Sequence, residues 1–218
     1  MNQYKAVLFD LDGTLLNTIA DVATASNLAL QRNNFPTHSI ESYQRMVGHG
    51  LQDLISKTLP DHLEHEDEVI KRVLKDMLSE YENCYAVHTR PYPGIIEMLN
   101  GLTSKGVRLS VLSNKGDYFT KKIIDHIFNE YKFDIVLGAR EDVPRKPDPT
   151  AAFEIMESMN LTSEDYLYMG DSPTDMKTAL ACNMFPVGVS WGYRSVEEIE
   201  KAGAKVVIKH PVELLSLL

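Results

Sequence analysis

The sequence is poor in cysteine and has no long hydrophobic run. Its two cysteines, Cys84 and Cys182, belong to no CxxC pair, so we expect them to be buried thiols in a reducing compartment. No apolar run approaches the roughly 20 residues that a membrane-spanning helix needs. The first residues show neither a basic region nor the apolar core of a signal peptide. These absences argue against a disulfide-stabilised or membrane-embedded protein and predict a cytoplasmic location.

Basic residues are also in the minority. Acidic residues number 31 and basic residues 22, which gives a formal net charge of −9. A surface of this sign repels phosphate backbones, so nucleic acid is not an expected partner. A small anionic substrate remains compatible with it, because one cation or metal ion reverses the field inside a single cleft. With 44% hydrophobic residues over 218 positions, the chain has enough material for a core, and the sequence allows a monomer or a homodimer.

Short apolar runs of strand length alternate with helical patterns along most of the chain. These runs are rich in β-branched and aromatic residues and lack strict alternation, as is typical of strands covered on both faces. Repeated strand–helix–strand units predict an α/β fold, a Rossmann-like parallel sheet with helices on both faces. The expected strands are Lys5–Asp10, Val107–Ser113, Ile135–Gly138, Tyr166–Gly170, Phe185–Val189 and Lys205–Ile208.

Residues 16–85 interrupt this alternation with helical patterns and no convincing strand. We interpret them as a helical cap inserted after the first strand, with residues 1–15 and 86–218 forming the core. Pro91-Tyr-Pro93-Gly94 marks the return to the core, because two prolines and a glycine punctuate helices strongly. The expected cap helices are Ile19–Asn33, Ser39–Val47, Gly50–Lys57 and His65–Tyr85.

The segment Val7–Leu15, VLFDLDGTL, places two carboxylates at the end of an apolar strand. In open parallel sheets, ligands bind beyond the carboxyl ends of the strands. Asp10 and Asp12 are therefore expected where a substrate binds, and Gly13 allows the chain to turn there. Taken alone, the two acids are equally consistent with an Asx turn that closes the strand.

Three further motifs contain polar residues that follow expected strands or begin expected helices. Each has an ordinary interpretation by itself, as a loop pair, an exposed lysine or a helix N-cap. Together with the first motif they supply acids, neutral donors and one cation, which are the groups that metal-assisted phosphoryl transfer needs. These residues are Ser113 and Asn114 in SNK, Lys146 in the stiff turn RKPDP, and Asp171 and Asp175 in GDSPTD.

The order DLDGTL, SNK, KPDP and GDSPTD resembles the haloacid dehalogenase superfamily. The PYPGI segment, the VSWGYRS loop and the AKVVIKHPVELL tail are similar to its phosphoglycolate phosphatase-like members. Two departures are visible, because Asn17 stands where relatives often carry an acid and Ala181-Cys-Asn-Met184 replaces the more usual Ala-Gly-Met. Neither position is expected to hold substrate atoms, so the departures bear on the subfamily more than on the chemistry.

The resemblance implies a Mg²⁺-dependent phosphatase that acts on a small-metabolite phosphomonoester, with phosphoglycolate as the leading candidate. Asp10 would attack phosphorus and form an aspartyl phosphate. Mg²⁺ would lie between Asp10, Asp171 and the backbone carbonyl of Asp12, because a carboxylate otherwise repels a phosphate dianion. Asp175 would orient a metal-bound water or hydrogen-bond Lys146, with direct ligation as the lesser option.

The same resemblance assigns proton transfer to Asp12, which would protonate the leaving alkoxide and then accept a proton from the attacking water. Ser113, Asn114 and Lys146 would balance the charge on the phosphoryl oxygens. Dehalogenases and phosphonate-cleaving members of the superfamily lack the acid found here at Asp12. Its presence therefore favours phosphate esters.

Three other functions are compatible with these motifs. A sugar phosphomutase resembling β-phosphoglucomutase uses the same pair of acids but protects its aspartyl phosphate from water. Inorganic pyrophosphatase activity is a second possibility within the superfamily. From a different class, a non-catalytic module could bind a phosphorylated ligand, although the four intact residues Asp10, Asp12, Lys146 and Asp171 argue against it.

One loop of the expected cap is a candidate substrate contact. Gly48 and Gly50 flank His49 between two helices, and Gly48 and His49 are interpreted as contacts to the leaving group. The alternative is an ordinary helix–helix connection with an exposed histidine. The other histidines show no ligand spacing with the cysteines, so a zinc site is not expected.

Overall fold

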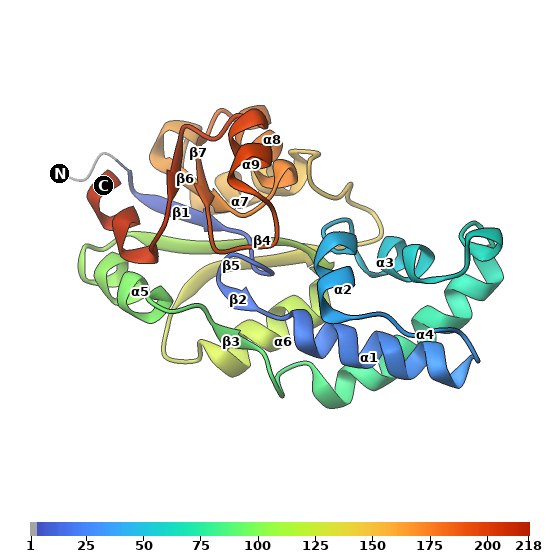
Figure 1. Cartoon of the computed structure of the whole chain (residues 1–218). Helices are drawn as coiled ribbons and strands as arrows, with labels where there is room; N and C mark the ends of the chain where they lie inside the picture. The colour runs from blue at the N-terminus through green and yellow to red at the C-terminus, as the bar shows by residue number, and fades with distance from the viewer. Residues whose placement is uncertain (1–3) are drawn as a thin grey trace. The chain divides into compact units, whose positions relative to one another are not determined.

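The computed structural model describes residues 4–218 and divides the chain into two compact units (Figure 1). The sheet unit comprises the residues up to Asn17 together with Pro91–Leu218, and the helical unit comprises Thr18–Arg90. The chain crosses between them at 17/18 and 90/91, whereas the sequence suggested 15/16 and 85/86. Two short paired strands, β2 (Leu16–Asn17) and β3 (Arg90–Pro91), lie at these crossings.

The sheet unit is built on a six-stranded parallel sheet with the strand order β5-β4-β1-β6-β7-β8. This confirms the α/β class predicted from the sequence. The central strands β1 and β6 are buried along their whole length, as expected for apolar strands covered on both faces. The six strands are β1 (Ala6–Phe9), β4 (Arg108–Gly116), β5 (Phe133–Ala139), β6 (Tyr166–Gly170), β7 (Phe185–Val189) and β8 (Val206–Ile208).

The register of the central strands brings their carboxyl ends to one edge of the sheet. Phe9 at the end of β1 pairs with Val111 on β4 and with Met169 on β6. The backbone N–H of Asp10 then donates to the carbonyl of Met169 at 2.9 Å. The polar residues that follow these three strands therefore lie side by side at the carboxyl edge of the sheet.

Helices cover both faces of this sheet. In Figure 1, α5 and α6 lie on one side and α7 and α8 on the other. Apolar residues of α7 and α8, such as Ile155 and Ala179, form one core cluster with Leu8 and Tyr168 of the sheet. The helices are α5 (Ile95–Ser104), α6 (Asp117–Ile127), α7 (Thr150–Met159), α8 (Pro173–Ala181) and α9 (Val196–Lys201), with short 3₁₀ helices at Ser163–Asp165 and Pro211–Leu217.

The helical unit contains the four helices that the sequence predicted. Its two long helices, α1 and α4, pack against each other, and Asn33 at the end of α1 donates to Asp76 of α4 at 2.8 Å. Asn27 of α1 also accepts from the Tyr43 hydroxyl of α2 at 2.7 Å. The helices are α1 (Ile19–Arg32), α2 (Ile40–Met46), α3 (Leu51–Thr58) and α4 (Asp67–Cys84), with a 3₁₀ turn at Asp61–Leu63.

A buried carboxylate fastens the two ends of the helical unit together. Asp21, in the first turn of α1, is fully buried. Its oxygens accept from the backbone N–H groups of His88 at 2.9 Å and Thr89 at 2.8 Å, and from the Thr89 hydroxyl at 2.7 Å. These bonds hold residues 88 and 89 within the helical unit, which places its boundary later than the helical pattern alone indicates.

We expect Asp21→Ala to lower the free energy of unfolding by about 3 kcal/mol or more, because it leaves several buried donors without an acceptor. Asp21→Asn should cost less, since its amide keeps one acceptor oxygen. The measurement is urea unfolding of the whole chain. Thr24→Ala on the same helix removes an exposed hydroxyl bonded to the Ala20 carbonyl and is the matched control. A loss for Asp21→Ala no larger than for Thr24→Ala would contradict a fastening role.

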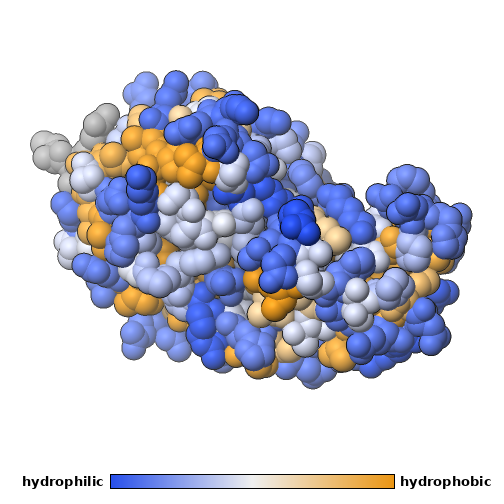
Figure 2. Space-filling model, in the orientation of Figure 1, coloured by the Kyte–Doolittle hydropathy of each residue, from blue (hydrophilic) through white to orange (hydrophobic). Residues whose placement is uncertain are grey.

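Polar side chains dominate the face of the molecule that Figure 2 shows. Most of the face drawn in Figure 2 is hydrophilic, and apolar surface is confined to separate patches. Exposed large apolar side chains are dispersed over different helices, for example Leu28 on α1, Tyr118 on α6 and Phe153 on α7. Among the described residues, no helix combines the length and the apolar character needed to cross a bilayer.

Candidate active site

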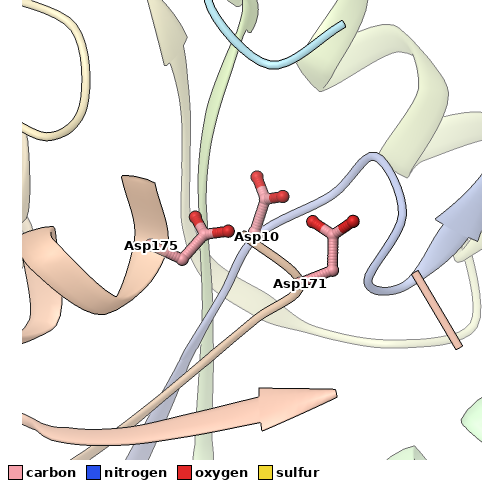
Figure 3. Close-up of side chains that lie close together, drawn as sticks. All are labelled: Asp10, Asp171 and Asp175. Carbon is pink, nitrogen blue, oxygen red and sulfur yellow. The ribbon is translucent and has the colours of Figure 1, made fainter. Parts of the chain in front are cut away.

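Three buried aspartates converge at the carboxyl edge of the sheet. Asp10 follows β1, Asp171 follows β6 and Asp175 lies in the first turn of α8. Each offers a carboxylate oxygen within 4.8 Å of the others. Figure 3 shows the three carboxyl groups pointing to the same side. Such a set of oxygen donors suits a hard divalent cation.

Lys146 supplies the cation of this cluster. Its ammonium donates to Asp10 at 2.7 Å, to Asp175 at 2.7 Å and to the Leu112 carbonyl at 2.9 Å. These three contacts match the three donors of an ammonium group. The Lys146 side chain is 3% exposed, so it holds a single position between the nucleophile candidate and the helix α8.

Burial and mutual repulsion make the ionised forms of the clustered carboxyl groups unfavourable in the absence of a cation. Burial raises the pKa of Asp10 well above its ordinary value, and the nearby Asp175 adds to that rise while Lys146 partly offsets it. Burial likewise raises the pKa of Asp171 to about 7, again with a contribution from Asp175. Burial alone would lower the pKa of the Lys146 ammonium, but the adjacent carboxylates outweigh burial and hold that pKa well above its ordinary value. A bound cation would relieve this repulsion.

Two loops close around Asp171 and leave no room for larger side chains. Tyr193 donates its backbone N–H to Asp171 at 2.7 Å. A Cβ atom on Gly13 would lie 2.3 Å from an Asp171 carboxylate oxygen, and one on Gly192 would lie 2.2 Å from the Asp171 Cβ. Gly13 also has a φ of 85°, a region that glycine adopts readily. Only glycine fits at these two positions, because the Asp171 side chain packs directly against their backbone.

Asp175 has both carboxylate oxygens engaged. One accepts from Lys146, and the other accepts from the Ser172 hydroxyl at 2.6 Å and the Ser172 N–H at 3.1 Å. Ser172 in turn caps α8, which makes the pair a reciprocal capping box. The motif therefore caps α8 through Ser172, not through Asp171, whose carboxylate belongs to the acid cluster.

A bulge at the end of β4 presents the SNK motif. Leu112 pairs with Leu137 of β5 and Gly116 pairs with Ala139, so three residues of β4 face only Gly138. Bulges of this kind re-aim side chains beside functional sites. The bulge also explains why β4 extends to Gly116, past the end predicted at Ser113.

The three bulge residues are buried and take part in the site. The Asn114 amide donates to the Lys146 carbonyl at 3.0 Å and accepts from the Lys146 N–H at 2.9 Å. Asn114 therefore fixes the backbone of Lys146. The sequence did not suggest this role for Asn114. The Ser113 hydroxyl accepts from the Lys115 N–H at 3.2 Å.

Lys115 is the site residue that the sequence analysis missed. Its ammonium lies 3.4 Å from a carboxylate oxygen of Asp12, and the two side chains are 2% and 25% exposed. A lysine in SNK was visible in the sequence. Its pairing with Asp12 was not, because the two residues are 103 positions apart in the chain.

The structure thus brings seven of the predicted site residues to one edge of the sheet unit. The remaining two, Gly48 and His49, lie in the loop between α2 and α3 of the helical unit, and both are exposed. Gly48 has a φ of 126° and Gly50, the N-cap of α3, has a φ of 96°, so the loop depends on glycine at both positions. The residues gathered in the sheet unit are Asp10, Asp12, Ser113, Asn114, Lys146, Asp171 and Asp175.

The chain is similar to known proteins over most of its length. Residues 7–189 match the family model described as haloacid dehalogenase-like hydrolase. A phosphoglycolate phosphatase of Nitrosospira multiformis is 31% identical over 216 residues, which cover 98% of this chain and 95% of the relative. One of Pseudomonas savastanoi pv. phaseolicola is 31% identical over 94% of this chain and 76% of the relative.

Solved structures give the same result for the fold. The crystal structure of a predicted phosphoglycolate phosphatase from Haemophilus somnus superposes with a TM-score of 0.90 at 26% identity, covering 100% of this chain and 99% of that one. A hydrolase from Pseudomonas syringae superposes with a TM-score of 0.74, also at 26% identity, over 97% and 96% of the two chains. With its motifs gathered at one sheet edge and its family model spanning most of the sequence, the chain belongs to the haloacid dehalogenase-like hydrolase family.

Proposed function

We propose that this protein is a Mg²⁺-dependent phosphatase of small phosphomonoesters, with phosphoglycolate as its leading candidate substrate. The observation that carries the proposal is the buried group of Asp10, Asp171 and Asp175 with Lys146 held 2.7 Å from Asp10. The relatives named phosphoglycolate phosphatase support the substrate.

Asp10 is the proposed nucleophile. Its carboxylate attacks phosphorus, the bond from phosphorus to the ester oxygen breaks, and an aspartyl phosphate forms. Lys146 fixes one Asp10 oxygen and balances charge that develops on the phosphoryl oxygens. Ser113 and Asn114, at the bulge, are proposed to donate hydrogen bonds to the same phosphoryl oxygens.

Asp12 is the proposed general acid and base. It delivers a proton to the leaving alkoxide and then takes one from the water that hydrolyses the aspartyl phosphate. Its carboxylate is one-quarter exposed, whereas that of Asp10 is nearly buried. This difference suits a group that exchanges protons with substrate and water.

Asp10, Asp171 and the backbone carbonyl of Asp12 are the proposed ligands of Mg²⁺. When bound, the ion neutralises the charge of the carboxylates and of the substrate phosphate. Asp175 is proposed to act behind these ligands, since both of its oxygens are already bonded to Lys146 and Ser172. Gly48 and His49 remain proposed contacts to the leaving group.

The test is a screen of small phosphorylated metabolites with released phosphate as the readout, in Mg²⁺ and in excess EDTA. We expect phosphate release in Mg²⁺ only. Full activity in EDTA would contradict the metal requirement. Conversion of a hexose phosphate to its isomer without phosphate release would identify a mutase, and pyrophosphate as the best substrate would identify a pyrophosphatase.

The pKa of Asp171 predicts how metal binding depends on pH. In the metal-free protein this pKa is raised to about 7 from an ordinary value of 3.8. Between these values the folded state holds more protons than the unfolded state, so its free energy of unfolding falls as the pH rises. A cation binds the ionised form, so the increase in Tm on adding excess Mg²⁺ should grow between about pH 6 and pH 8.

Differential scanning fluorimetry with and without Mg²⁺ measures this increase. Asp171→Asn, which keeps the size of the side chain but carries no charge, should show a smaller increase at every pH because it removes one proposed ligand. A Mg²⁺-induced increase in Tm that is constant from pH 6 to pH 8 in the unmodified protein would overturn the prediction.

A further inference from the structure

The Asp12–Lys115 pair divides the site into two charged sides. Lys146 contacts Asp10, and Lys115 contacts Asp12 at 3.4 Å. The proposed chemistry assigns Asp10 to the attacking side of the phosphoryl group and Asp12 to the leaving group. Lys115 therefore lies on the leaving-group side of the site.

The position of Lys115 is fixed by its backbone. Its N–H donates to the Ser113 hydroxyl at 3.2 Å, and its carbonyl accepts from the Thr120 hydroxyl at 3.1 Å. Gly138 allows the close approach of the neighbouring strand, since a Cβ there would lie 2.6 Å from the Lys115 carbonyl oxygen. The bulge therefore places this lysine as firmly as the sheet places Asp10.

The contact with Asp12 is an ion pair that is longer than a charge-assisted hydrogen bond. Such bonds measure about 2.7–2.9 Å, whereas the Lys115 ammonium lies 3.4 Å from the Asp12 oxygen. The Lys115 side chain is 2% exposed, so water screens its charge poorly and an anion beside it interacts strongly. An anionic group that the leaving group brings beside Asp12 would therefore interact strongly with this ammonium.

The ester oxygen must lie within about 3.2 Å of the Asp12 carboxyl for proton transfer. If the Asp12 oxygen that lies 3.4 Å from the Lys115 ammonium also transfers the proton, the ammonium lies within about 7 Å of the ester oxygen. A carboxylate two bonds from the ester oxygen, as in a 2-phospho-carboxylic acid, spans this gap. A neutral alkyl leaving group offers nothing to the ammonium.

We infer that Lys115 binds an anionic group on the leaving group and so selects small phosphomonoesters that carry a carboxylate next to the ester. This inference deepens the proposed function and rests on it for the assignment of Asp12. It assigns the carboxylate to the sheet unit, independently of the proposed contacts Gly48 and His49. A lysine that only oriented Asp12 would affect kcat/KM for all esters equally. A lysine that binds the carboxylate affects only the esters that carry one.

The kinetic test compares 2-phosphoglycolate with ethyl phosphate, which has a neutral leaving group of similar size. In Lys115→Met, the ratio of kcat/KM for phosphoglycolate to that for ethyl phosphate should fall tenfold to a hundredfold, mainly through KM. Lys115→Arg should restore most of the ratio. Lys121→Met, which removes an exposed lysine paired with Asp117 on α6, is the control and should leave the ratio unchanged.

A binding measurement separates this inference from the proposed reaction. The probes are 3-phosphonopropionate and propylphosphonate, which replace the ester oxygens of the two substrates by methylene and resist hydrolysis. By calorimetry in Mg²⁺, Lys115→Met should weaken the first at least tenfold and the second much less. One outcome is that Lys115→Met weakens the two probes in this way while the unmodified protein hydrolyses neither ester. In that case the proposed function fails and the Lys115 inference stands.

Three results would overturn the inference. Equal weakening of both probes by Lys115→Met would make Lys115 a general support of the site. No weakening of either, or no binding of 3-phosphonopropionate to the unmodified protein, would remove the carboxylate contact. If the methionine variant fails to fold, Lys115→Gln and Lys115→Arg carry the same comparison, since glutamine keeps the polar character without the charge.

Discussion

Asp10→Asn should reduce turnover by at least about 10⁴-fold while the protein stays folded. The amide has nearly the same shape as the carboxylate but is a poor nucleophile, so no aspartyl phosphate can form. The measurement is steady-state phosphate release from the best substrate in Mg²⁺. Acid-quenched protein should retain label from a ³²P-labelled substrate in the unmodified chain and not in the variant.

For the same variant we expect a loss of activity without a loss of thermal stability. Burial and Asp175 raise the pKa of Asp10, so its ionised form is unfavourable in the metal-free protein. Removing that charge should leave the metal-free Tm at neutral pH unchanged or higher, although Lys146 loses one charged partner. A large fall in Tm together with lost activity would show that Asp10 is needed mainly for the fold.

The sequence was sufficient for the sheet and for the meeting of Asp10 and Asp171 at one of its edges, because both depend on local patterns. β6 and β7 begin and end at the predicted residues, since apolar runs bounded by loops show strands directly. Parallel strands align their carboxyl ends, and the motifs that follow them therefore had to meet. The position of Asp10 beside Asp171 follows from this register.

What the sequence could not show are contacts between residues far apart in the chain. The partnership of Lys115 with Asp12 depends on a bulge in β4, and nothing in the local pattern of β4 indicates an extra pair of residues. Asp21 in the first turn of α1 reads as an ordinary helix-start acid. Its bonds to His88 and Thr89 arise only when the ends of the helical unit meet.

Asp12→Asn should reduce turnover of alkyl phosphates by about 10²–10⁴-fold, the usual contribution of general acid–base catalysis. An alkoxide leaves poorly without a proton. A nitrophenolate leaves without one, so for p-nitrophenyl phosphate the first step should proceed almost normally in the variant. The second step still lacks its base, because Asp12 also activates the attacking water in the proposed mechanism.

These two expectations give Asp12→Asn a distinctive time course with the aryl substrate. Rapid-mixing absorbance should show a burst of nitrophenolate close to one equivalent per protein, followed by a slow steady state. With the unmodified protein, which has its base, the burst should be smaller relative to the steady rate.

Equal losses in the first step for ethyl and p-nitrophenyl phosphate would mean that Asp12 positions the ester or Lys115 and transfers no proton. Lys115→Met serves as the comparison, since it disturbs the same ion pair without removing the acid, and it should give no such burst.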